Sequence, residues 1–184
     1  MMGATLSNIE PTYEPTFLSS QVQPQFGVLT GCMAYTGTLL EIRRLYERFR
    51  RYSSSTHHIP LSNFTVVTRN SPIEGLSDAY LAFGKGPSKD INVLEFICLL
   101  VVYASTMWEF KVLFLMRLFD FDSDKCLAQD EVTILCSAVL NGFAAVTGHQ
   151  RLQTAQLTAI SSEVFRSADI HPDGLLTCDE YFSM

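Results

Sequence analysis

The sequence lacks features that several common classes of protein require. Its net charge is -6 and its pI is near 5.1, so it has no basic excess of the kind that a nucleic-acid-binding face needs. Residues 1–30 are rich in Pro, Ser, Thr and Gln and contain no apolar stretch typical of a signal peptide. We therefore expect no nucleic-acid partner and a cytoplasmic location.

The cysteines and the apolar runs exclude further classes. The five cysteines are scattered and lack CxxC spacing, which argues against a disulfide framework or a zinc site and favours a reducing compartment. The longest uncharged apolar run, residues 96–108, is roughly half to two thirds of the length that a membrane span requires. Charged residues flank this run, so we predict a buried helix there.

No arrangement typical of a catalytic centre is present. No nucleophile stands with a base, and no cluster of catalytic metal ligands is evident. Gly84 and Gly86 lack the GK[ST] sequence of a phosphate-binding loop, so a turn is the better interpretation. We expect that the chain is not an enzyme.

Residues 120–131 carry acidic side chains at a regular spacing. Asp120, Asp122, Asp124 and Glu131 take positions 1, 3, 5 and 12 of this stretch. A hard cation such as Ca²⁺ needs six or more oxygens, and a tight loop supplies them from alternate side chains, one backbone carbonyl and a closing bidentate Glu. The spacing therefore predicts a Ca²⁺-binding loop.

The same loop departs from the pattern at position 6. Lys125 stands where a glycine is expected, so a left-handed backbone there costs roughly 1 kcal/mol and a positive charge lies beside the cation. Cys126 would contribute only its carbonyl, and Ala128 leaves position 9 to water. Leu127 is the apolar residue that we expect to pair with a neighbouring loop.

A second loop of the same kind covers residues 169–180. Leu176 takes position 8 and is predicted to pair with Leu127, whereas His171 replaces a carboxylate or amide at position 3. Positions 1, 5, 6, 9 and 12 match the pattern and are Asp169, Asp173, Gly174, Thr177 and Glu180. Two alternatives stay open: at least one of the loops binds Ca²⁺, or both are metal-free and remain because paired loops hold four helices together.

Two degenerate loops precede these. Residues 52–63 have Ile59 at position 8 but Ser, Thr and His where carboxylates should stand, and residues 84–95 have Ile91 at position 8 and Glu95 at position 12. An internal repeat of this kind is a strong indication of architecture. We predict helices over residues 36–51, 75–83, 106–119, 129–140 and 154–168, and a linker over 141–153 in which Gly142 and Gly148 act as breakers.

With two degenerate and two nearly regular loops, the chain resembles the EF-hand superfamily across residues 36–184, in a layout similar to calcineurin B and the neuronal calcium sensors. The resemblance implies an all-α fold of two paired EF-hand lobes, with short β-ribbons between paired loops. The expected parts are an extended N-terminal arm (1–35), an N-terminal lobe with the two degenerate hands (36–104) and a C-terminal lobe with the two near-regular hands (105–184). The last hand is short, so either it closes with a stub of helix or the polypeptide continues past Met184, and we favour the second alternative.

The resemblance also implies two sets of metal ligands. The first set is Asp120, Asp122, Asp124, the carbonyl of Cys126 and Glu131. The second set is Asp169, Asp173, the carbonyl of Leu175, Thr177 directly or through water, and Glu180. A neutral imidazole is a poor ligand for Ca²⁺, so His171 is not included.

Proteins of this family are implied to be non-enzymatic and to dock a target helix in an apolar groove. The leading hypothesis is a Ca²⁺-binding adaptor or sensor that binds a protein target. One alternative is a structural scaffold embedded in a cytoskeletal or ciliary (axonemal, microtubule-associated) assembly, and another is a regulatory subunit of a phosphatase or kinase. The expected location is cytoplasmic, with the cytoskeleton or a cilium or flagellum as the more specific alternatives.

Three further features leave alternatives open. Gly3 fits a myristoylation pattern, so a membrane partner is expected only if Gly3 is acylated. The paired residues His57 and His58 are better explained as a solvated loop than as a metal site or pH switch. The stripe of Trp108, Phe110, Phe114, Met116 and Phe119 is typical of a core, and a target groove is the alternative.

Overall fold

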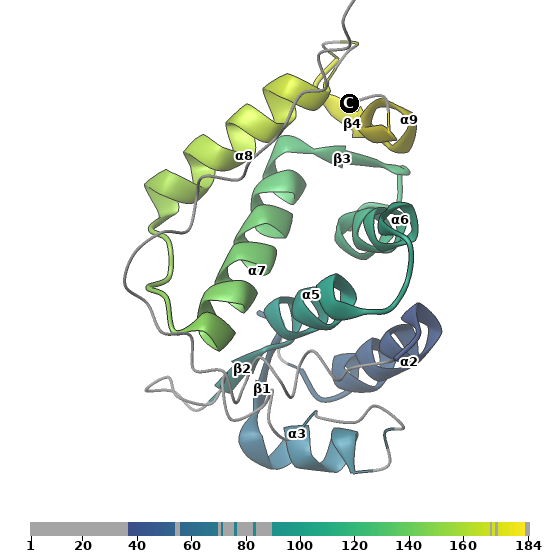
Figure 1. The fold of residues 1–184 in the computed structure, drawn as a ribbon, viewed down its shortest axis with the longest axis vertical. Helices are drawn as coiled ribbons and strands as arrows, with labels where there is room; N and C mark the ends of the chain where they lie inside the picture. Colours follow the sequence, from purple (N-terminus) through teal and green to yellow (C-terminus); the bar gives the residue numbers. More distant parts are fainter. Residues whose placement is uncertain are drawn as a thin grey trace, which may run out of the picture.

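The computed structural model describes residues 37–53, 56–69, 71, 76, 83, 90–169, 171 and 173–182. Within these ranges the chain is mostly helical, with seven helices and two two-stranded sheets (Figure 1). The predicted all-α class is confirmed. The expected arm over residues 1–35, Gly3 and most of the helix predicted over 75–83 lie outside the described residues.

The described residues form helices and strands in each half of the chain. The first half contains α2 (Leu39–Arg50), β1 (His58–Pro60), α3 (Leu61–Thr68), β2 (Asp90–Asn92) and α5 (Val93–Tyr103). The second half contains α6 (Trp108–Phe119), β3 (Cys126–Ala128), α7 (Gln129–Thr147), α8 (Thr154–Ala168), β4 (Leu175–Thr177) and α9 (Cys178–Phe182). The predicted bounds of α8 are confirmed at both ends.

Helix α2 begins at a capping box. The Thr38 hydroxyl accepts a hydrogen bond from the Glu41 backbone N–H (3.3 Å), and the Glu41 carboxylate accepts one from the Thr38 N–H (2.8 Å). These bonds satisfy donors that a helix N-terminus leaves free. The bonds that the Thr38 N–H and hydroxyl donate to the Glu41 carboxylate hold the pKa of Glu41 below its usual range. Ile42, Leu45 and Phe49 then lie buried on one face.

Two antiparallel ribbons join segments that are far apart in the sequence. Ile59 of β1 faces Ile91 of β2, and Leu127 of β3 faces Leu176 of β4. All four side chains are 0–2% exposed, so each ribbon adds its central pair to the core. The predicted pairing of Leu127 with Leu176 is confirmed.

Helix α5 contributes to both hydrophobic clusters of the molecule. Phe96 belongs to the first cluster, where its ring centroid lies 5.9 Å from that of Phe49 and 5.2 Å from that of Phe64. Leu94 and Cys98 belong to the second cluster. A helix buried all around is typical of a core element, and it joins the two halves. The boundary predicted between residues 104 and 105 stays a prediction.

The apolar run over residues 96–108 is not one continuous helix. Helix α5 ends at Tyr103 and α6 begins at Trp108, so the single buried helix predicted there is wrong at its C-terminal end. Met107 and Trp108 are 61% and 55% exposed at this turn. The hydropathy of the run did not reveal that one helix ends and another begins within it.

Helix α7 is longer than predicted. It was expected to end at residue 140, with Gly142 as a breaker, but it continues to Thr147 and ends at Gly148, which has φ 73°. A Cβ on Gly142 would lie 2.5 Å from the carbonyl oxygen of Glu95. Gly142 therefore allows α7 to pass close to the start of α5 rather than ending the helix.

Helix α7 lies between α5 and α8 (Figure 1) and packs against both. By length and composition it is also long and apolar enough to cross a membrane, as no other helix within the described ranges is. The core helix of a compact protein meets the same criterion, and 44% of the apolar window of α7 is buried against its neighbours.

Candidate metal centre

The turn after α6 brings three carboxylates together. The side-chain oxygens of Asp120, Asp122 and Asp124 lie within 4.8 Å of one another. Asp120 is partly buried, and the other two residues are exposed. The first three side-chain ligands predicted from the sequence are therefore neighbours in space.

Backbone N–H groups of the loop orient these carboxylates. The Asp124 and Lys125 N–H groups donate to the two oxygens of Asp120, each at 3.1 Å, and the Cys126 N–H donates to Asp124 at 2.7 Å. This backbone path passes through the left-handed region at Ser123 (φ 65°) and Lys125 (φ 73°). The positive φ expected at Lys125 is confirmed, and Ser123 shows a second one that the sequence reasoning missed.

Glu131 lies at the end of the loop but faces its backbone. Its residue is 6% exposed, and its two carboxylate oxygens accept hydrogen bonds from the N–H groups of Phe121 (2.8 Å) and Ala128 (3.0 Å). The group of converging oxygens consists of the three aspartates, without Glu131. The predicted closing ligand therefore accepts hydrogen bonds from Phe121 and Ala128 of its own loop and does not join the three aspartates.

The loop after α8 has a similar closing residue. Glu180 accepts hydrogen bonds from the Thr177 N–H (2.9 Å), the Thr177 hydroxyl (2.8 Å) and the His171 N–H (3.1 Å). The bonds from Thr177, followed by that from the His171 backbone, hold the pKa of Glu180 below its usual range. Gly174 has φ 82°, so its predicted turn is present.

The other predicted ligands of this second loop are less closely grouped. The Asp173 carboxylate accepts a hydrogen bond from the Leu175 N–H at 3.0 Å. Asp169 has a buried Oδ1 atom with no hydrogen-bond partner among the described residues. Within those residues, Asp169, Asp173 and Glu180 do not form a group of the kind that the three aspartates form.

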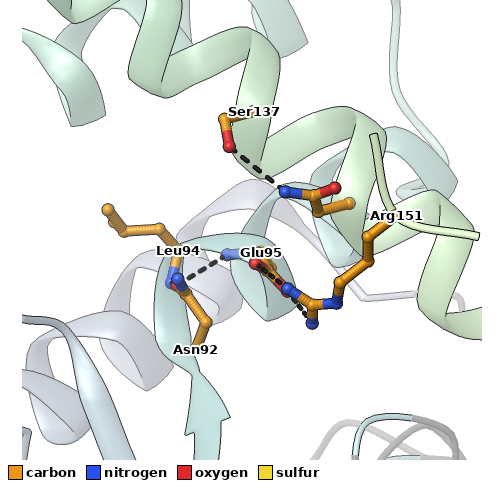
Figure 2. A network of polar contacts seen from close by, with 6 residues as sticks. Asn92, Leu94, Glu95, Ser137 and Arg151 are labelled. Carbon is orange, nitrogen blue, oxygen red and sulfur yellow. Dashed lines mark hydrogen bonds and ion pairs between the residues drawn. The ribbon is translucent and has the colours of Figure 1, made fainter. Parts of the chain in front are cut away.

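Glu95, at position 12 of the second degenerate loop, is bound by an arginine that the sequence did not indicate. Figure 2 shows Arg151 reaching Glu95 from the segment between α7 and α8, with Nη1–Oε1 and Nη2–Oε2 distances of 2.8 and 2.7 Å. The Glu95 side chain is 5% exposed. Burial raises the pKa of Glu95, and the bonds from Arg151 oppose this rise.

Other polar groups lie near the Glu95–Arg151 ion pair. The Asn92 side chain accepts hydrogen bonds from the N–H groups of Leu94 and Glu95 and caps α5. Asn141 of α7 donates to Ser137 at 3.2 Å, while its own oxygen is buried without a partner among the described residues. The contact between the start of α5 and α7 therefore combines the Glu95–Arg151 ion pair with one acceptor, the Asn141 oxygen, that has no partner among the described residues.

The two predicted loop histidines behave differently. His58 is exposed, as expected for a solvated residue. His57 is partly buried, and its ring stacks on Phe121 of the aspartate loop, with centroids 6.0 Å apart. Burial, followed by the nearby charge of Arg50, lowers the pKa of His57. The prediction of a solvated pair is therefore wrong for His57.

An apolar pocket of about 330 Å³ lies between α6, α7 and α8, with the β3–β4 ribbon at one end. Met116 and Val132 at its wall are buried, whereas Ile160 is 38% exposed. The lining residues are Val112, Leu115, Met116, Leu127, Val132, Leu135, Cys136, Val139, Leu140, Ile160, Val164 and Leu176.

The aromatic stripe of α6 is divided between core and surface. Met116 and Phe119 are buried, and Phe114 is partly buried, as expected of a core stripe. Trp108 and Phe110 are 55% and 52% exposed, so the core interpretation fails at the N-terminal end of the helix.

Comparisons with known proteins add no relative to this picture. A scan against protein-family models and a search among curated proteins found no match for the chain. Membership of a family therefore stays a prediction.

Proposed function

We propose that this chain is an EF-hand protein that binds Ca²⁺ in the loop over residues 120–131 and acts as an adaptor or sensor for a protein target. One observation carries the proposal: the carboxylates of Asp120, Asp122 and Asp124 converge within 4.8 Å next to a ribbon in which Leu127 faces Leu176. The spacing of the ligands, the left-handed turn and the ribbon are all typical of an EF-hand loop.

The donor set of this loop fits Ca²⁺. The residues that would hold the ion are Asp120, Asp122, Asp124, Glu131 and, through its carbonyl, Cys126. All of these donors are oxygens, which a hard cation prefers to nitrogen or sulfur. Three carboxylates at this separation repel one another, and a bound divalent cation would supply the positive charge that removes the repulsion.

We assign a weaker site to residues 169–180. The buried Oδ1 of Asp169, which has no hydrogen-bond partner among the described residues, favours a cation there, because such an acceptor is otherwise costly. Glu180, however, already accepts three hydrogen bonds, and His171 offers an imidazole at 3.6 Å from Glu180 in place of a carboxylate. Asp173, Thr177 and the Leu175 carbonyl would complete the set.

The apolar pocket between α6, α7 and α8 supports a protein target. It is open to apolar anchors of an amphipathic helix, and Leu127 and Leu176 of the ribbon line it together with Met116. The ribbon thus connects the aspartate loop with the pocket. A cation that reorganises the loop would change the shape of this surface.

A structural scaffold is the second candidate, and the Glu95–Arg151 pair favours it. An internal guanidinium already neutralises the carboxylate at position 12 of this loop, so this part of the protein needs no cation to hold its form. Exposed Met107 and Phe110 would suit a permanent contact in a large assembly.

Dye fluorescence distinguishes these two functions. For a sensor, Ca²⁺ should increase the binding of an apolar dye by the full chain, because the pocket becomes more accessible. Mg²⁺ at equal concentration is the control, since it favours a smaller octahedral site. Dye binding that is high and unchanged by Ca²⁺ would support the scaffold and contradict the sensor.

A further inference from the structure

A groove of about 610 Å³ lies between α2 and α6. These two helices are on the side of the molecule opposite α8 (Figure 1). Its floor contains partly buried aromatic and aliphatic side chains, among them Tyr46, Phe114 and Leu118. Phe110, at its edge, is 52% exposed. The groove therefore offers aromatic surface to an occupant.

The walls of this groove are positively charged in a chain that is acidic overall. Arg43, Arg50 and Arg117 line it, together with one acidic residue, Glu47. Arg43 lies 3.4 Å from Glu47. Among the described residues, no carboxylate lies within ion-pair distance of Arg50 or Arg117, and both are exposed. A matching occupant would carry carboxylates between apolar residues.

Residues 10–17 of this chain have that chemistry. They repeat the sequence Glu-Pro-Thr-aromatic twice, ending in Tyr13 and Phe17, so that Glu10 and Glu14 alternate with the two rings. No Lys or Arg occurs before Arg43. We propose that residues 9–18 dock in the α2–α6 groove, with Glu10 and Glu14 near Arg50 and Arg117 and the two rings against its aromatic floor.

The prolines favour this contact. A segment with proline at every fourth position prefers an extended conformation, so little conformational entropy is lost when it docks on an aromatic groove. Residues 9–18 would bind as proline-rich peptides bind aromatic surfaces. Their acidic residues would favour the α2–α6 groove because it is basic.

The tether makes the contact possible within one molecule. The described chain begins at Gly37, and Thr38 and Leu39 line the groove, so the described end of the tether lies next to it. The 19 residues from 19 to 37 can span up to about 60 Å when extended, and their average reach is about 24 Å. A short tether of this kind gives an effective concentration in the millimolar range.

Photo-cross-linking in the full chain tests the proposal. Phe17 is replaced by p-benzoylphenylalanine, the protein is irradiated at about 1 µM, and the cross-linked peptides are mapped by mass spectrometry. Cross-links within one chain from position 17 to α2 or α6 are expected. Arg50→Glu/Arg117→Glu should lower their yield at least about tenfold, because two attractive contacts become repulsive.

Two further variants make the result specific. Arg44→Glu/Arg51→Glu changes the charge equally at exposed residues that do not line the groove, and it should leave the yield within about twofold. Adding Glu10→Arg/Glu14→Arg to Arg50→Glu/Arg117→Glu should restore the cross-link. Cross-links to other elements, covalent dimers that indicate a second copy's arm, or a yield that charge reversal leaves unchanged would each overturn the proposal.

Discussion

Glu95 and Glu131 occupy the same position in two loops of the predicted repeat, and they differ in what binds them. Both are buried, at 4% and 6% exposure. Arg151 holds both oxygens of Glu95, whereas the partners of Glu131 among the described residues are two backbone N–H groups, beside three converging aspartates. Both carboxylates are buried, so their neighbouring charges would decide which loop gains from a cation.

The largest effect is expected from Glu131→Gln. If Glu131 closes the Ca²⁺ site, losing its charge and its bidentate closure should weaken binding about 100-fold, or ~2.7 kcal/mol, in a competition titration against a chelator. Asp130→Asn is the matched control, because it removes the same charge from an exposed neighbour and should change the affinity by no more than about twofold. An equal loss of Ca²⁺ affinity in both variants would mean that the net charge of the loop, and not Glu131 as a ligand, determines the affinity.

The contact between the two halves should be sensitive to Gly142→Ala. The added Cβ would meet the Glu95 carbonyl oxygen at 2.5 Å, so α5 and α7 must separate. We expect the free energy of unfolding in urea to fall by about 2–3 kcal/mol, even though alanine favours a helix. Gly148→Ala has open space but φ 73°, and should cost about 1 kcal/mol. A smaller loss at Gly142 than at Gly148 would contradict this role.

Arg151→Met tests whether the ion pair substitutes for a cation. Breaking a buried pair is strongly destabilising, but Arg151 is 55% exposed, so we expect a loss of about 1–2 kcal/mol in the free energy of unfolding at pH 7. Arg166→Met removes an exposed pair with Glu163 and should cost about 0.5 kcal/mol or less.

The loss in Arg151→Met should depend on pH. Burial raises the pKa of Glu95, and Arg151 opposes the rise, so the pKa in the variant is higher still. A carboxyl with a raised folded pKa favours folding when protonated, and this contribution is lost as pH rises through that pKa. The deficit should therefore be smaller near pH 4 than at pH 7. A deficit that grows on acidification would exclude this account.

The smallest effect concerns the strained turn of the aspartate loop. Lys125→Gly removes both a left-handed residue with a side chain and a positive charge, and should strengthen Ca²⁺ binding roughly fivefold, about 1 kcal/mol. Ser123→Gly relieves a similar φ without changing charge. Calorimetry on both variants separates the two causes, and equal gains would show that the charge of Lys125 is unimportant.

Local signals predicted much of the fold. The bounds of α8 followed from the helical periodicity of its own residues. The pairing of Leu127 with Leu176, which lie far apart in the sequence, followed from the equal position of each residue in its own loop. The extent of α7 did not, since Gly142 serves a contact with Glu95 that no local pattern shows. Helix propensity alone predicts that a helix ends at a glycine, and only the packing of Gly142 against α5 explains why α7 continues.

The sequence predicted which residues could be ligands at the candidate site, but it did not predict their hydrogen bonds and ion pairs. Asp120, Asp122 and Asp124 follow a spacing that can be read directly. Arg151 could not be assigned, because 56 residues separate it from Glu95 and no motif links them. The hydrogen bonds of Glu131 to Phe121 and Ala128 likewise depend on three-dimensional closure of the loop.

Calorimetric titration of the full chain with Ca²⁺, in about 1 mM Mg²⁺, tests the central claim most directly. We predict a saturating heat from one dominant site, with a dissociation constant on the order of 10 µM. This heat should be retained in Arg151→Met, whereas the dissociation constant should rise about 100-fold in Glu131→Gln. No heat up to millimolar Ca²⁺, or the same heat in Glu131→Gln, would contradict the assignment of a Ca²⁺ site to residues 120–131.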